Sequence, residues 1–153
     1  MEPPAQRPRT LLVVLSDIRP ELEPDFIRWY DEEHLPQRLA VPGFIRAARY
    51  EAGPAVYSAS LAMPEAPPPK HLAVYEMEGP DVLESEPYRQ LIANPSEWTR
   101  RIRSTFDLRL RQSYVERFRL SADDPRVESF RGDPPTSLPA RRGGGSIMVL
   151  TYE

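Results

Sequence analysis

The feature that most constrains the fold is an uninterrupted apolar run near the start of the chain. Residues 10–18, TLLVVLSDI, are apolar at five consecutive positions and rich in branched side chains. This pattern predicts a strand, and successive side chains of a strand point to opposite faces of its sheet. Both faces of that sheet therefore need a cover.

The segment 24–38, PDFIRWYDEEHLPQR, carries the clearest helical pattern of the chain. Tyr30 and His34 are one turn apart, so they share the apolar face of the predicted helix. Pro36 disfavours helical geometry at the residue before it. We therefore expect the helix to end near His34 or Leu35, which places His34 in the last turn on the buried face.

Further strands and a second helical region are predicted along the rest of the chain. Strands are expected over residues 44–51, 71–78 and 108–118. Ser85 is the expected N-cap of a helix over residues 86–93, which Asn94-Pro95 ends, and Ser96 caps a shorter helical piece. The order over residues 10–118 is β-α-β-β-α-β, which is that of a ferredoxin-like α+β fold.

The remaining segments are rich in proline, glycine or alanine. We expect a disordered arm over residues 1–9, a long connection with an optional strand extension at 55–61, and a flexible linker over 119–145. Residues 146–153, SIMVLTYE, are predicted to form a fifth, C-terminal strand.

The predicted sheet has helices on one face only, although its first strand is apolar on both sides. The other face must find a cover, and a second copy of the chain is the simplest one. We therefore expect a homodimer that packs sheet against sheet.

Composition excludes several classes of function. The net charge is −3 with no basic block, which argues against binding nucleic acid, and the absence of cysteine excludes disulfides and thiolate chemistry. No run approaches the ~18 apolar residues of a membrane span. Because no apolar signal core follows the N-terminus, we expect a cytoplasmic protein.

His34 is the first candidate for catalysis, because imidazole can act as a general acid or base near neutral pH. The helix C-terminus would favour its protonated form and burial would oppose it. Tyr30 could donate a hydrogen bond to a substrate oxygen. The alternative is a core histidine that is bonded to a backbone carbonyl.

Other candidates lie on the predicted strands. The tyrosines that could reach a cavity are Tyr50, Tyr75 and Tyr114, and the alternative for each is a core aromatic residue. The strand arginines are Arg46, Arg49, Arg109 and Arg111. They could recognise a carboxylate or phenolate, although interface or edge salt bridges are the favoured interpretation.

No metal site is expected. The acidic residues Asp31, Glu32 and Glu33 lack the spacing of a two-ligand helical site, so they are interpreted as a solvated face. His71 is the only other histidine, and its position after PPPK predicts exposure.

Several motifs together resemble one known family. They are WYDEEHLP at 29–36, VPGF at 41–44, RY at 49–50 and PYRQLIANPSEWT at 87–99. These motifs resemble the EthD-like branch of the dimeric α+β barrel superfamily over about residues 10–118. The resemblance implies a protomer that dimerises through its sheet, has a cavity between sheet and helices, and carries a functional histidine at the position of His34.

The resemblance and the residues together predict a small cofactor-independent enzyme. It would perform acid–base chemistry (isomerisation, cyclisation or oxygenation) on an aromatic, enol or lactone metabolite. His34 and Tyr30 are the predicted catalytic residues, and the predicted substrate-binding residues are Tyr50, Tyr75, Tyr114 and Arg46. The alternative is a non-catalytic homodimer that binds a small ligand, and haem binding through His34 is the minor alternative.

Overall fold

Four antiparallel strands form one sheet in the computed structural model, which describes residues 8–53 and 67–128. The strands are β1 (Thr10–Ile18), β2 (Phe44–Glu51), β3 (His71–Met77) and β4 (Phe106–Val115), in the spatial order β2-β3-β1-β4. This arrangement confirms the predicted α+β fold with ferredoxin-like order. β1 and β2 have the predicted bounds, β3 ends one residue earlier, and β4 is shifted toward the N-terminus.

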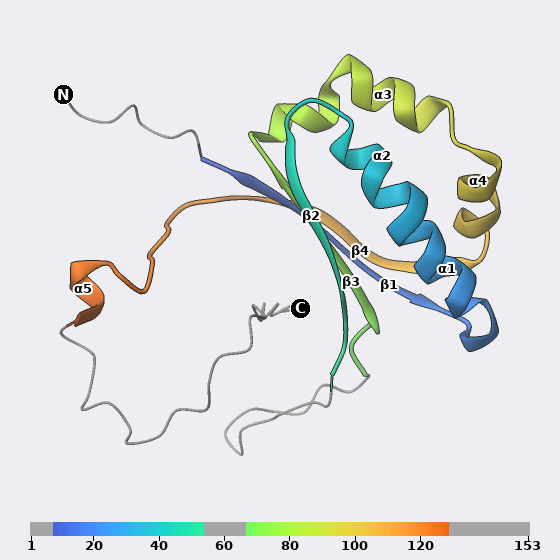
Figure 1. The fold of residues 1–153 in the computed structure, drawn as a ribbon, viewed down its shortest axis with the longest axis horizontal. Helices are drawn as coiled ribbons and strands as arrows, with labels where there is room; N and C mark the ends of the chain where they lie inside the picture. The colour runs from blue at the N-terminus through green and yellow to red at the C-terminus, as the bar shows by residue number, and fades with distance from the viewer. Residues whose placement is uncertain (1–7, 54–66, 129–153) are drawn as a thin grey trace. The chain divides into compact units, whose positions relative to one another are not determined.

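Short helices cover one face of this sheet (Figure 1). Between β1 and β2 they are η1 (Pro20–Leu22), α1 (Glu23–Trp29), η2 (Tyr30–His34) and α2 (Leu35–Leu39); between β3 and β4 they are η3 (Pro80–Glu84), α3 (Glu86–Ala93) and α4 (Glu97–Arg103). Ser85 and Ser96 cap α3 and α4 as predicted, each by accepting a backbone N–H of the first turn. Within the described ranges, no helix is both long enough and apolar enough to cross a membrane.

The predicted helix end at His34 or Leu35 is wrong. α1, η2 and α2 follow one another without a break, and the helical path continues through Pro36 to Leu39. The middle piece is a π turn, in which the N–H of Leu35 donates to the carbonyl of Tyr30, five residues back. Pro36 then lies in the first turn of α2, where its missing N–H leaves no bond unmade.

The core lies between the helices and the sheet. Phe26 and Trp29 of α1 are almost fully buried in a cluster that also includes Leu12 of β1 and Tyr75 and Met77 of β3. Because strand side chains alternate, the residues next to Leu12 along β1 point to the other face of the sheet. The helices therefore determine which side of each strand forms the core.

The prediction that His71 is exposed is wrong, since only 1% of this residue is accessible. Its Nε2 lies 2.8 Å from Oε1 of Glu23, and the same carboxylate oxygen lies 2.6 Å from Nζ of Lys70. The Lys70 hydrogen bond lowers the pKa of Glu23. This cluster joins the start of β3 to the start of α1 and provides the polar partner that a buried imidazole needs.

The second face of the sheet is covered by no helix of residues 8–53 or 67–118. Leu15 lies at its centre, directly between Leu72 of β3 and Leu110 of β4. On the same face Leu11 and Tyr114 pair across β1 and β4 and are 39% and 46% exposed. This face is therefore a largely apolar surface.

The chain divides into two compact units after Phe118. In the second unit, the short helix α5 (Pro125–Glu128) follows Asp124, whose carboxylate pairs with Arg126 at 2.8 Å. A helix therefore occurs within the segment that was predicted to be a linker. The predicted strands at 55–61 and 146–153 lie outside the described residues, as does most of the N-terminal arm.

The turn before β2 depends on Gly43, which has φ +94°. A Cβ at this position would also lie 2.5 Å from Cγ2 of Val82. We expect Gly43→Ala to lower the free energy of unfolding by about 1–3 kcal/mol, measured by urea denaturation. Gly53→Ala is the control, because a Cβ there meets no atom within 4 Å; equal losses in both variants would contradict this account.

Candidate functional site

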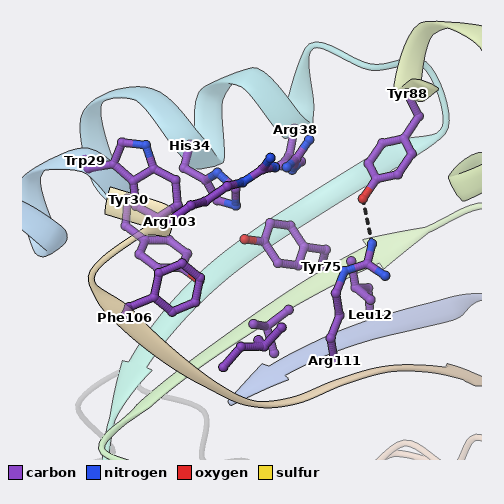
Figure 2. A pocket seen from close by; sticks show the side chains of 12 residues that line it. Leu12, Trp29, Tyr30, His34, Arg38, Tyr75, Tyr88, Arg103, Phe106 and Arg111 are labelled. Atoms are coloured by element: carbon purple, nitrogen blue, oxygen red, sulfur yellow. Dashed lines mark hydrogen bonds between the residues drawn. The ribbon is translucent and has the colours of Figure 1, made fainter. Parts of the chain in front are cut away.

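A cavity of about 360 Å³ lies between the helices and the sheet (Figure 2). This volume suits a small organic molecule. The residues that line it are Leu12, Val14, Trp29, Tyr30, His34, Arg38, Tyr75, Tyr88, Arg103, Phe106, Leu108 and Arg111.

His34 faces this cavity from the π turn. Its ring centroid lies 4.2 Å from that of Trp29, 5.1 Å from that of Tyr30 and 6.3 Å from that of Tyr75. Its Nδ1 is buried and has no hydrogen-bond partner among the described residues. An unpaired buried nitrogen is costly in a folded protein, so it is available to a ligand that enters the cavity.

The environment of His34 keeps its imidazole neutral. Burial lowers the pKa of His34 to about 2, and the positive charges of Arg38 and Arg103 act in the same direction. The favourable helix C-terminus that the sequence predicted is absent, because the helix continues to Leu39. At neutral pH His34 can accept a proton, but in the empty cavity it has none to donate from an imidazolium.

Two phenols lie beside this imidazole. Burial raises the pKa of Tyr30 to about 12 and also raises the pKa of Tyr75. Both hydroxyl groups are therefore protonated at neutral pH. The two hydroxyl groups interact with each other, and the pair offers O–H donors to an oxygen of a ligand.

Three arginines bring positive charge to the cavity, and no carboxylate of residues 8–53 or 67–128 lines it. Arg111 donates from Nη2 to the Tyr88 hydroxyl at 2.7 Å, and Cζ of Arg38 lies 5.2 Å from the centroid of the Tyr88 ring. Arg38 is only 7% exposed, and its Nη1 has no partner among the described residues. Burial accordingly lowers the pKa of Arg38, although a guanidinium stays charged.

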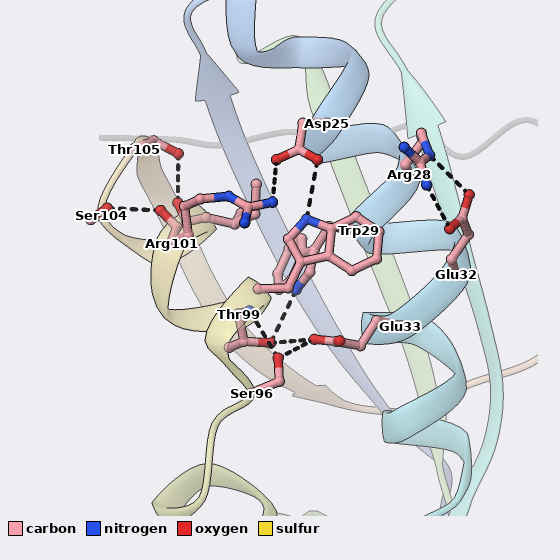
Figure 3. A network of polar contacts seen from close by, with 12 residues as sticks. Asp25, Arg28, Trp29, Glu32, Glu33, Ser96, Thr99, Arg101, Ser104 and Thr105 are labelled. Atoms are coloured by element: carbon pink, nitrogen blue, oxygen red, sulfur yellow. Dashed lines mark hydrogen bonds and ion pairs between the residues drawn. The ribbon is translucent and has the colours of Figure 1, made fainter.

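A network of hydrogen bonds fixes α4 against the helix that carries His34 (Figure 3). Thr99 donates from Oγ1 to Glu33 at 2.9 Å and accepts from Nε1 of Trp29 at 3.0 Å. Ser96 also donates to Glu33. The network orients the Trp29 ring beside His34 and sets the position of α4, which carries Arg103.

The acidic run before His34 is therefore only partly a solvated face. Glu32 is exposed and pairs with Arg28, and Asp31 pairs with Arg49 at 3.2 Å. Glu33, in contrast, turns toward α4. The sequence pattern did not separate these three neighbours, because the partners of Glu33 lie more than sixty residues away.

The structure brings together three of the predicted site residues, namely His34, Tyr30 and Tyr75. The strand register places the others on the far face of the sheet. There Tyr50 is the cross-strand partner of Leu72, Tyr114 that of Leu11, and Arg46 that of Glu76. Nε of Arg46 lies 3.8 Å from Oε2 of Glu76. None of these three lines the cavity. Arg49 and Arg109 form salt bridges, as the favoured interpretation of the strand arginines expected.

Sequence reasoning missed five polar or aromatic residues of the cavity, which are Trp29, Arg38, Tyr88, Arg103 and Phe106. Arg38 carried a usable signal, because it follows His34 by four residues and would share its face in an uninterrupted helix. The predicted helix end at Pro36 concealed this relation. Arg103 gave no signal that distinguishes it from Arg100 and Arg101 of the same helix.

No protein-family model matches the sequence, and no curated protein matches it either. Among solved structures, the chain is similar to that of HapK from Hahella chejuensis, with 8% sequence identity and a TM-score of 0.49. The match covers 73% of this chain and 95% of that chain.

The lowered pKa of His34 makes stability depend on pH. The unfolded chain binds a proton at this residue below pH 6.5 and the folded chain does not, so the free energy of unfolding falls as pH decreases from 6.5 toward 2. We expect a contribution of up to about 1.4 kcal/mol per pH unit.

Urea denaturation between pH ~6.5 and ~5, above the main titration of carboxylates, measures this slope. His34→Gln should remove the contribution of His34 while it keeps a polar side chain of similar reach. Parallel pH profiles for the wild type and the variant would contradict a neutral, buried imidazole.

Proposed function

We propose that the protein is a small cofactor-independent enzyme that moves a proton on an aromatic, enol or lactone substrate, with His34 as the base. We also propose that it belongs to the EthD-like branch of the dimeric α+β barrels. The observation that supports the activity best is a neutral imidazole that lines a cavity beside two protonated phenols and whose Nδ1 has no partner among the described residues.

In the proposed reaction, Nδ1 of His34 takes a proton from an acidic C–H or O–H bond of the substrate. The electron pair of that bond moves onto a substrate oxygen, which accepts a hydrogen bond from the Tyr75 hydroxyl. The imidazolium then returns the proton to another atom of the same molecule. Isomerisation and cyclisation need no further reactant, so they are favoured over oxygenation.

The low pKa of His34 is the main argument for the second candidate, a non-catalytic homodimer that binds a small ligand. An imidazole with a pKa of about 2 is a weak base. Catalysis therefore requires that the bound substrate raise this pKa. A negative charge that develops on the substrate does so, because it offsets the positive charges of Arg38 and Arg103.

Exchange of carbon-bound hydrogen for deuterium tests the proposed activity without knowledge of the natural substrate. The purified chain is incubated in D₂O with an enolisable aromatic keto acid, a β,γ-unsaturated lactone and a naphthol, and exchange is followed by NMR. We expect accelerated exchange on at least one of them, and at least a hundredfold loss in His34→Gln, since general-base catalysis contributes about 10²–10⁴-fold.

Two tyrosine variants provide a matched control. Tyr75→Phe removes the buried hydroxyl that interacts with that of Tyr30 and should slow exchange about tenfold. Tyr50→Phe removes a hydroxyl on the other face of the sheet and should leave exchange unchanged. Absence of exchange on all three compounds would favour the binding protein instead, and full activity in His34→Gln would refute His34 as the base.

We further propose that a second copy of the chain covers the helix-free face of the sheet. This face is rich in leucine at its centre, and its aligned rows of side chains suit packing against an identical sheet. Leu15 lies in the middle of the leucine row, so it would be buried at the centre of the dimer.

Light scattering at micromolar concentration should give the mass of a dimer for the wild type. Leu15→Lys should give a monomer, because it places a charge in the apolar contact. Ile92→Lys is the control, since Ile92 is a 38% exposed apolar residue of α3 and lies outside the proposed contact. A monomeric wild type would refute the dimer.

A further inference from the structure

We infer that the substrate of the proposed reaction carries a carboxylate, which binds among the guanidinium groups of Arg38, Arg103 and Arg111. The role of this substrate in the reaction rests on the proposed function, whereas the binding of a carboxylate does not. The charges in the cavity are not balanced.

The three arginines of the cavity differ from most other arginines of the described chain. A carboxylate lies within 4 Å of Arg9, Arg19, Arg28, Arg46, Arg49, Arg89, Arg101, Arg109 and Arg126. Among the described residues, no carboxylate lies within that distance of Arg38, Arg103 or Arg111, and none lines the cavity. The cavity therefore holds positive charge that the protein itself does not neutralise.

Arg38 places one of these three charges in the interior, whereas Arg103 and Arg111 are exposed. The Arg38 side chain is more than nine-tenths buried, and its buried Nη1 lacks a partner among the described residues. Removing a charge from water without a partner costs free energy. A bound anion would offset that cost, and the planar fork of a guanidinium matches the two oxygens of a carboxylate.

The rest of the cavity indicates what the carboxylate is attached to. In Figure 2 the Arg38 and Arg103 side chains extend toward His34, whereas Arg111 lies beside Tyr88. The walls between them are formed by apolar side chains, which include Leu12, Val14 and Phe106. A compact aromatic or enol carboxylate fills such a space with its ring against these walls.

A carboxylate in this position would also activate the base. The groups that face His34 are the phenols of Tyr30 and Tyr75 and the cations of Arg38 and Arg103. The positive charges of the two arginines oppose protonation of the imidazole. An anion that neutralises these cations makes the imidazole more basic. The substrate would thus supply the charge that its own deprotonation requires.

Binding of benzoate to the full chain, measured by isothermal titration calorimetry, tests the inference. Benzamide has the same ring and size but no charge, and it should bind at least tenfold more weakly. Arg103→Met and Arg111→Met should each weaken benzoate binding about tenfold, because each variant removes a charge-assisted hydrogen bond to the carboxylate. Both residues are exposed enough to be replaced without disturbing the core.

Matched controls lie on the same two elements. Arg101 is two residues from Arg103 on α4 and pairs with Asp25, and Arg109 is two residues from Arg111 on β4 and pairs with Asp107. Arg101→Met and Arg109→Met should bind benzoate as the wild type does. Equal affinity for benzoate and benzamide, unchanged affinity in both cavity variants, or no binding of benzoate at millimolar concentration would overturn the inference.

The binding experiment can fail or succeed independently of the proposed activity. His34→Gln should keep its affinity for benzoate within about threefold, because it leaves the three guanidinium groups in place, while deuterium exchange is lost. Anion binding without exchange would retain the carboxylate site and reject the enzyme. Deuterium exchange without a preference for benzoate over benzamide would retain the enzyme and reject the carboxylate site.

Discussion

The π turn at Tyr30–His34 is the constraint on which the candidate site depends. A regular helix would meet Pro36 with a missing hydrogen bond and a steric clash, and the sequence would then favour a break. The wider turn carries the helix past the proline, so that Tyr30, His34 and Arg38 all reach the same cavity. A phenol, an imidazole and a guanidinium are thereby held by one rigid element, and π turns of this kind are frequent at functional sites.

The cavity combines groups that a stable core would normally avoid. It holds a buried pair of phenols, together with an imidazole nitrogen and a guanidinium N–H that have no partner among the described residues. The two unpartnered groups lower the stability of the empty protein; the carboxylate proposed above would accept from the guanidinium, and a substrate O–H would donate to the imidazole. The Glu33–Thr99–Trp29 network holds the surrounding helices in place, which allows the cavity to keep these groups apart from one another.

The sequence predicted those parts of the fold that depend on neighbouring residues. The apolar run of β1, and the serine caps of α3 and α4, are local signals, and the structure has them where they were expected. The path through Pro36 was missed because a π turn is stabilised by packing against the sheet and leaves no local pattern. For the same reason Arg38 was overlooked.

Strand residues posed a different problem. Neither alternating set of β2 side chains was cleanly polar, so the sequence could not tell which set meets the helices, and the register shift between Phe44 and Arg46 left no sequence pattern. Only the pairing of Ala47 with Tyr75 assigns Tyr50 and Arg46 to the far side. His71 was likewise judged from its polar neighbours in sequence, whereas its buried position depends on Glu23, forty-eight residues away.

The position of Trp29 makes its fluorescence sensitive to the contents of the cavity. Its indole lies on the cavity wall within 4.2 Å of the imidazole centroid, whereas Trp98, the second indole of the chain, lies outside the cavity beside Arg28. A guest molecule replaces water next to one fluorophore and leaves the other in its original surroundings. The emission spectrum of the unlabelled chain therefore distinguishes the empty cavity from the occupied one.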